Sequence, residues 1–333
     1  MNDKLLPAPN PFSEKPKVRG MVIKDIVREN IPWFVLIIIS TIFSFLFPHF
    51  LTFRNITNIF RNSSLIGIVA IGMTFAMIGG TFDLSVGTVL GLSTVITIQM
   101  QPTTLGSSLY IITIAMASGA FVGFLNGLIV GRWRTNSIIT TIGTSLVVLG
   151  ATLIYTQGKH ISAENMYPPL AFIGTGRVYE IPAPIFIFIG VAIVGHLVLS
   201  ITRFGRYLYA IGGNATAAIF SGIKVGRIRT IAYMISGFTA AVGGIMIAAR
   251  TQYVDPSFGV GLEMDVLTGV LLGGISLFGG RGTVIGTIAG VLLLHVINNA
   301  MTLSGIPYEV QLMIRGMILV ATVAVNVIWE KRG

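Results

Sequence analysis

Long apolar runs separated by short polar segments make up most of the chain from residue 31 onward. A helix needs about 20 apolar residues to cross a bilayer. On this measure we expect ten membrane spans, with approximate cores at 31–50, 63–80, 84–100, 109–130, 138–155, 183–201, 231–249, 265–279, 283–301 and 310–329. The eighth run is short, so it could be re-entrant or could form one broken unit with the ninth. The pattern predicts an all-α integral membrane protein.

Composition supports this fold class and leaves little room for soluble domains. The chain has 333 residues, of which 53% are hydrophobic and only 10% are charged. Soluble domains carry about a quarter charged residues. We therefore expect a cytoplasmic N-terminal tail over residues 1–30 and a single transmembrane domain over residues 31–329, with a long polar loop at 202–230.

The distribution of Lys and Arg predicts the orientation of the ten spans. With the N-terminus inside, the inside segments hold 16 of these cations and the outside segments hold 5. Cytoplasmic loops are enriched in Lys and Arg, so both termini and the loop 202–230 are expected in the cytoplasm. The net charge of +10 follows from these loops and does not indicate nucleic-acid binding.

The loop 202–230 contains a short helix signal between two basic arms. It carries five cations and no acid, and within it Asn214 follows two glycines as a good N-cap. About two helical turns can follow before Gly222, which favours the left-handed stop. An ordinary positive-inside loop would need no small-residue face, whereas a helix that docks on another protein would. The predicted docking helix and its caps comprise Gly213, Asn214, Ala217, Ala218, Ser221 and Gly222.

Five polar residues within the apolar runs are candidates for function. Asp83 precedes the third span, where its carboxylate, assisted by Ser85, could cap the helix or contact a substrate. Asn126, Asn298 and Asn299 lie in spans and could line a polar path for a hydroxylated solute. Hydrogen bonding between helices is the alternative role for these three amides.

Further charged residues lie near the eighth and tenth spans. Glu263 and Asp265, with Asp255 and Arg250, are interpreted as an external surface that is either solvated or able to meet a partner. Arg315 falls inside the last span. Proton-coupled transporters carry pairs of ionisable residues in their spans, and no such pair of carboxylates is evident here.

The sequence also repeats one local pattern. A Gly-Gly pair, a turn and a GTV(L/I)G helix start occur over 79–91 and again over 273–286. An internal duplication explains this pattern, and chance similarity of glycine-rich membrane sequence is the alternative. Both turns face the cytoplasm in the predicted topology, and the second consists of Gly279, Gly280, Arg281 and Gly282.

Several kinds of chemistry have no motif in this chain. Cysteine is absent, and there is no GxxxxGK(S/T), HExxH or GxSxG pattern. We therefore expect a protein that is not an enzyme, binds no cofactor or metal itself, and obtains its energy from a partner.

Three ordered motifs resemble a known family. AIGMT…IGGTFDLSVG over 70–87, GNATAAIFSGI over 213–223 and GGISLFGGRGT over 273–283 resemble the inner-membrane permease subunits of ATP-binding-cassette (ABC) importers for ribose and other simple sugars. The resemblance implies a type II importer fold and a second permease subunit, identical or related. It also implies a cytoplasmic ATPase whose two nucleotide-binding modules hold ATP-Mg, and a periplasmic or lipid-anchored sugar-binding protein.

By the same resemblance, the helix at 214–221 is the coupling helix that docks in the ATPase, and the protein lies in a bacterial inner membrane. The sugar is not identified. Two alternatives remain open: a branched-chain amino-acid permease of the same superfamily, and an ion-coupled secondary transporter that works alone.

Overall fold

A computed structural model describes the backbone of residues 18–331 and the side chains of residues 30–328. The first part of the predicted tail, residues 1–17, lies outside the described residues. The helices are α1 Val18–Leu46, α2 Phe53–Ile78, α3 Val86–Gln99, α4 Leu105–Gly127 with the π-helix η1 Leu128–Arg132, α5 Ser137–Thr156, α6 Pro168–Thr175, α7 Ala183–Ile201, α8 Arg203–Gly213, α9 Ala215–Phe220, α10 Val225–Thr251, α11 Leu262–Leu272, α12 Val284–Leu303 and α13 Tyr308–Lys331.

Each predicted span corresponds to one helix, and the all-α class is confirmed. Within the described part of the chain, seven helices are long and apolar enough to cross a membrane: α2, α4 with η1, α5, α7, α10, α12 and α13. The apolar part of α1 and the whole of α3 are shorter. Helix α11 has only 11 residues, or about 16 Å at 1.5 Å per residue.

Two predicted span ends were wrong. The first span ends at Leu46 instead of residue 50, because residues 48–51 form a turn. Its start at residue 31 falls inside the continuous helix α1. The eighth span ends at Leu272 instead of residue 279, because Gly274 adopts the left-handed conformation at φ +82° and stops the helix. The eighth segment is therefore a short helix, as expected, and a turn separates it from α12.

Helices α2 and α10 form the centre of the bundle, and most of their residues are buried. Helix α10 packs against α2, α3 and α4. At its crossing with α4, Gly119 and Gly237 meet backbone to backbone, and a β-carbon on either would overlap the other chain. Small residues allow such close packing in membrane helices. Helix α13 is the least buried of the seven long apolar helices and packs mainly on α11.

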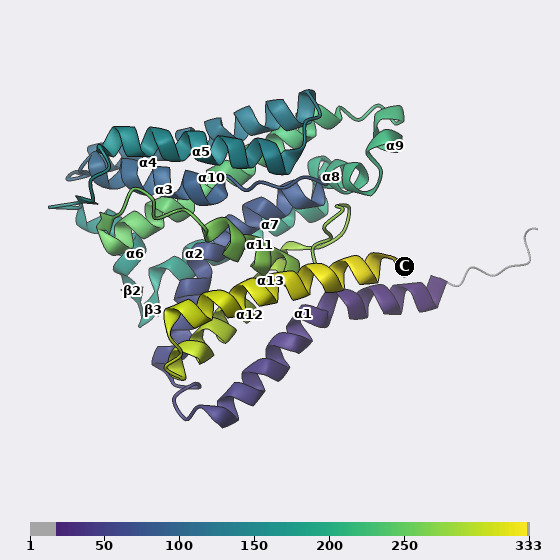
Figure 1. Cartoon of the computed structure of the whole chain (residues 1–333), viewed down its shortest axis with the longest axis horizontal. Coiled ribbons are helices and arrows are strands. Elements are labelled where there is room, and N and C mark those ends of the chain that lie inside the picture. The colour runs from purple at the N-terminus through teal and green to yellow at the C-terminus, as the bar shows by residue number, and fades with distance from the viewer. Residues whose placement is uncertain (1–17, 332–333) are drawn as a thin grey trace, which may run out of the picture.

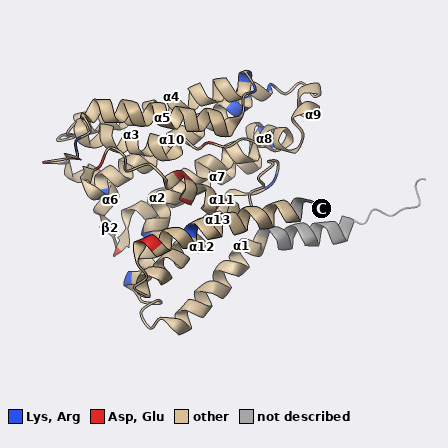
Figure 2. Ribbon diagram, viewed as in Figure 1, with Lys and Arg blue, Asp and Glu red and all other residues tan. Residues whose placement is uncertain are grey.

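The two ends of the bundle differ in structure (Figure 1). One end carries the short strands β1 Ile161–Ser162, β4 Tyr253–Val254, β2 Arg177–Val178 and β3 Ile181–Pro182. Strand β1 pairs antiparallel with β4, and β2 with β3. The opposite end carries α8, α9, the start of α1 and the C-terminal end of α13. Several cations gather at this second end (Figure 2).

Candidate functional site

Helix α9 is capped as the sequence predicts. The Oδ1 atom of Asn214 accepts a 2.9 Å hydrogen bond from the backbone N–H of Ala217. After the helix, Gly222 adopts φ +80°, and its N–H donates to the carbonyl of Ile219 at 2.9 Å. Both caps are therefore confirmed, and they let six residues form a helix despite the usual cost of nucleation.

The outer face of α9 differs from the predicted small-residue face. Ala218 is buried against the protein, while Ala217 and Ser221 are exposed. Phe220 projects outward with 88% of its surface exposed. The signal for it was an aromatic residue at the end of a short segment that is otherwise mostly small, and our sequence interpretation did not use it. An exposed aromatic beside small residues is suited to a protein interface.

Helix α8 anchors α9 to the bundle. The side chain of Thr202 accepts from the N–H of Gly205 at 3.2 Å and so begins the helix. Leu208 and Ile211, three positions apart, are fully buried, while Arg203 and Arg206 are exposed. This spacing places one apolar face on the bundle and one basic face in solvent.

The C-terminal end of α8 meets two turns in a contact that we call the glycine junction: Ile78–Gly80, Gly212 and Gly279–Gly280. The N–H of Gly280 donates to the carbonyl oxygen of Ile78 at 2.9 Å. A β-carbon on Gly212 would overlap both Ile78 and Gly280. Gly279 and Gly280 themselves adopt φ +90° and +72°, which glycine tolerates best.

Two side chains reinforce the glycine junction. The Nε atom of Arg229, near the start of α10, donates to the carbonyl of Gly79 at 3.1 Å. The hydroxyl of Tyr209 in α8 donates to the carbonyl of Gly282 at 2.7 Å. Arg281 in the same turn is exposed. The two predicted turns therefore meet each other, and both contact the element that carries α9.

Asp83 and its neighbours form a second cluster, deeper in the bundle. The Oδ1 atom of Asp83 accepts from the N–H of Ser85 at 3.1 Å and from the hydroxyl of Ser85 at 2.6 Å. Asn126 of α4 donates to the Ser85 hydroxyl at 2.9 Å, and Thr144 of α5 donates to Asn126 Oδ1 at 2.6 Å. The Oδ2 atom of Asp83 is buried and accepts no hydrogen bond from the residues that the structure describes.

This chain of hydrogen bonds bears on two of the predicted roles. Asp83 binds Ser85, the residue before α3, and not an N–H group inside the helix as the predicted N-cap would. Asn126 joins the segment before α3 to α5, which confirms hydrogen bonding between helices for this amide. The hydroxyl of Tyr233 donates to the carbonyl of Phe82 at 2.8 Å and brings α10 into the same cluster.

The two remaining amides behave differently from each other. Asn299 of α12 and Asn55 of α2 exchange two side-chain hydrogen bonds, at 2.7 and 2.9 Å, so Asn299 also joins helices. The Oδ1 atom of Asn298 is buried and has no hydrogen-bond partner within the described part of the chain. Of the three asparagines, Asn298 alone has a buried side-chain oxygen left for another molecule.

The interpretation of Asp265 and Glu263 as an external surface was wrong. Asp265 accepts a 3.1 Å hydrogen bond from Arg315 Nη1, and this ion pair joins α11 to α13. Glu263 lies against Gly87 of α3 and accepts from the N–H of Gly261 at 3.1 Å. Asp255 does lie in an exposed loop, where it pairs with His160 at 3.2 Å. The contacts of the first two acids depend on packing between distant segments.

Comparison with known proteins identifies the family. The family described as "Branched-chain amino acid transport system / permease component" matches residues 55–323, which covers α2 to α12 and most of α13. The chain belongs to this permease family. It is a multi-pass, non-catalytic membrane subunit of a bacterial ABC importer.

Named relatives of the permease cover almost its whole length. It is 37% identical over 307 residues to a ribose import permease of Haemophilus influenzae, covering 91% of this chain and 95% of that one. It is 36% identical over 295 residues to the Bacillus subtilis ribose import permease, with 89% and 91% covered. An L-arabinose ABC transporter permease of Azospirillum brasilense is 35% identical over 320 residues, with 95% and 92% covered. No solved structure matches the permease.

Proposed function

We propose that the permease imports a simple sugar or a sugar-like solute that an external binding protein delivers. Curated relatives that cover about nine tenths of the chain are named for ribose and L-arabinose, which supports this substrate class. The energy comes from a cytoplasmic ATPase with two nucleotide-binding modules, which holds the ATP and Mg²⁺. A second permease subunit, identical or related, completes the path through the membrane.

The proposed topology has ten spans with both termini in the cytoplasm. It is supported by the arrangement in Figure 1, where α8, α9, the start of α1 and the end of α13 lie at one end of the bundle. The cations of the loop 202–230 lie at that end too, as the positive-inside rule requires of a cytoplasmic face. Helices α3 and α11 are too short to cross alone, so each crosses together with the non-helical segment beside it.

Helix α9, with Gly213, Asn214, Ala217, Ala218, Ser221 and Gly222, is the proposed coupling helix. The observation that carries this role is the glycine junction, because Gly212 lies two residues before the N-cap Asn214 and touches two membrane turns at once. A displacement of α9 by the ATPase therefore reaches Ile78–Gly80 and Gly279–Gly280 through backbone contacts, with no flexible side chain between them. The turn Gly279–Gly282 acts as the receiving element.

Among the polar groups, Asn298 is the proposed contact of the translocation path, because its buried oxygen has no partner. Asp83 and Ser85, with Asn126, hold the start of α3 in place instead. Few directional polar groups are then offered to the solute. Weak binding inside the permease favours release, and specificity rests with the external binding protein.

Reconstitution in proteoliposomes tests the proposal. Uptake should require the permease, the ATPase, ATP and one solute-loaded binding protein, and a panel of pentoses, hexoses, polyols and branched-chain amino acids would identify the solute class. Uptake of an amino acid alone would overturn the sugar assignment. Uptake by the permease with only an ion gradient would overturn the ATP-driven mechanism.

A further inference from the structure

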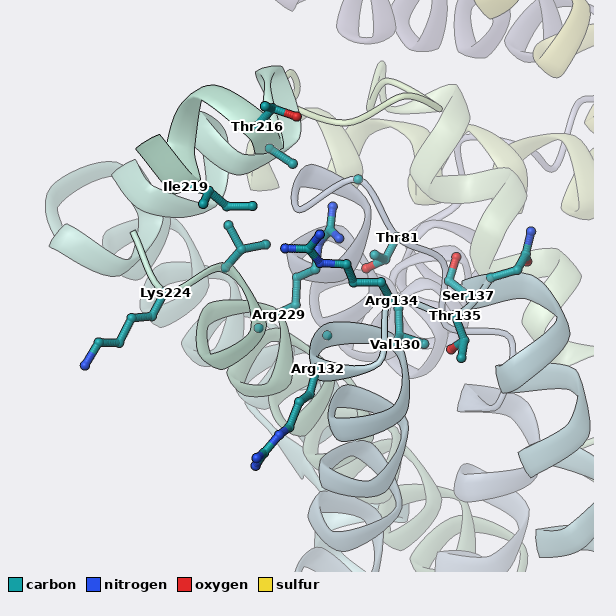
Figure 3. Close-up of a pocket in the computed structure, with 16 residues that line it drawn as sticks. Thr81, Val130, Arg132, Arg134, Thr135, Ser137, Thr216, Ile219, Lys224 and Arg229 are labelled. Carbon is teal, nitrogen blue, oxygen red and sulfur yellow. The ribbon is translucent and has the colours of Figure 1, made fainter. Parts of the chain in front are cut away.

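A basic cleft lies beside α9 at the proposed cytoplasmic end. Its volume is about 620 Å³. Four segments line it: one face of α9, the start of α10, the turn after α2, and the end of η1 with its connection to α5 (Figure 3). The coupling helix therefore forms one wall of the cleft, and the connection 132–136 forms the opposite wall.

The four cations that line this cleft are oriented in two ways. Figure 3 shows the side chains of Arg134 and Arg229 turned toward each other within the cleft, while Arg132 and Lys224 point away from it. Among the residues that the structure describes, no acidic residue lines the cleft. The backbone of Arg134 has a φ of +56°, which residues other than glycine adopt rarely. Arg229 is held by its hydrogen bond to Gly79.

Two guanidinium groups that face each other without a carboxylate repel one another. Arg134 is the cationic neighbour that acts on Arg229, and among the described residues neither forms an ion pair. The positive-inside rule explains why cations occur in cytoplasmic loops, but not why two of them converge on one cavity. The arrangement lacks an anion, and guanidinium groups bind planar carboxylates with two parallel hydrogen bonds.

We infer that this cleft receives a carboxylate side chain of the cytoplasmic ATPase, held between Arg134 and Arg229 while α9 docks in the ATPase. This inference rests on the proposed function, since it requires the ATPase as partner. A six-residue helix is about 9 Å long, so a protein surface that holds α9 extends beyond it and covers the cleft beside it. The connection 132–136 is then a second contact, independent of the coupling helix in sequence.

The cleft also gives the ATPase a second route to the membrane turns. Arg229 binds the proposed carboxylate through its terminal nitrogens, while its Nε remains on the carbonyl of Gly79. One side chain thus spans from the partner to the turn that follows α2. The same turn also contacts α8, through the glycine junction.

Charge reversal in the connection 132–136 tests the inference. Arg134→Glu and the matched control Arg132→Glu make the same change of charge two residues apart, but only the first side chain points into the cleft. Binding of the purified ATPase to each variant in neutral-lipid nanodiscs is measured over a range of salt. We expect Arg134→Glu to weaken binding at least tenfold and Arg132→Glu less than threefold. A series of acid-to-Lys substitutions on the ATPase should contain one that restores binding to Arg134→Glu.

Further measurements separate the other outcomes. Equal effects of the two reversals would overturn the inference. If millimolar inorganic phosphate weakens binding of the ATPase to the unmodified permease, the cleft binds a small anion instead. If Arg134→Glu weakens binding only in nanodiscs of anionic lipid, the cleft binds a lipid headgroup instead. Phe220→Asp on α9 tests the proposed function separately. If Phe220→Asp abolishes binding while Arg134→Glu does not, the coupling helix stands and the cleft inference fails; if neither changes binding, the proposed function itself fails.

Discussion

The backbone N–H of Gly280 donates a 2.9 Å hydrogen bond to the carbonyl oxygen of Ile78. These residues are 202 positions apart, yet they fasten the turn after α2 to the turn between α11 and α12. Gly212, near the end of α8, packs beside this bond at a place where a β-carbon would overlap both Ile78 and Gly280. The element that carries α9 is thereby in direct contact with both turns.

Substitutions at two adjacent glycines should therefore have opposite outcomes. Gly212→Ala places a methyl group against Ile78 and Gly280, whereas nothing lies within 4 Å of a β-carbon on Gly213. We expect Gly212→Ala to reduce ATP-driven uptake at least tenfold and Gly213→Ala to leave it within twofold. Uptake in proteoliposomes, normalised to the inserted protein, measures both. Equal activity of the two variants would argue against transmission through the glycine junction.

Loss of the α9 caps should uncouple transport without preventing membrane insertion. Asn214→Ala removes the bond to Ala217 and costs about 1 kcal/mol of helix stability. Gly222→Val forces a β-branched residue into φ +80° and costs more. The double variant should insert normally and fail to stimulate the ATPase. Asn214→Asp keeps an acceptor at the cap and should retain most of the coupling. Normal uptake by a well-inserted double variant would contradict the coupling role of α9.

The sequence predicts the helices of this permease well and their long-range contacts poorly. Asn214 and Gly222 could be assigned because a cap depends on residues within one turn. The buried face of α8 could have been found in the same way, from the spacing of Leu208 and Ile211. Our interpretation considered only the cations and small residues of this loop. The bond between Ile78 and Gly280 could not, because a glycine pair does not specify which distant backbone approaches it.

Charged residues show the same limit. Asp265 was assigned to an external surface because only its neighbours in sequence were considered. Its partner Arg315 is supplied by the packing of α13 on α11. Arg134 was counted as one cation among many, and its orientation into a cleft follows from the backbone turn before α5.

Removal of either member of the Asp265–Arg315 pair should destabilise the permease. About four fifths of each side chain is buried, and one charge would remain there without a partner. Breaking such a pair costs roughly 3 kcal/mol, whereas replacing both partners with apolar residues is often neutral. We expect Asp265→Leu and Arg315→Leu each to lower the Tm by several degrees and the double variant to recover most of the loss. Thermal unfolding in detergent measures this, with the exposed residue Glu309→Gln as control. A double variant less stable than both single variants would refute compensation.

Two asparagines should separate structural from transport roles. Asn126→Leu leaves Ser85 and Thr144 without their shared partner, so we expect a loss of about 1–3 kcal/mol of stability. Asn298→Leu breaks no side-chain bond of the buried Oδ1 atom, so we expect little change in Tm and a clear fall in the rate of uptake. Thermal unfolding and uptake assays on the same preparations provide both readouts. If Asn298→Leu lowers the Tm strongly and uptake falls only as much as the amount of folded protein, Asn298 has a structural role and does not contact the solute.

The short lengths of α3 and α11 bear on how the permease is synthesised. A segment of 11 residues covers only about half of the roughly 30 Å hydrocarbon core, so α11 is too short to span the bilayer as an independent unit. We therefore expect α11 to enter the membrane together with α12, as a hairpin joined by the glycine turn. The backbone contact between Ile78 and Gly280 is therefore made late in biogenesis, after nearly the whole chain has left the ribosome.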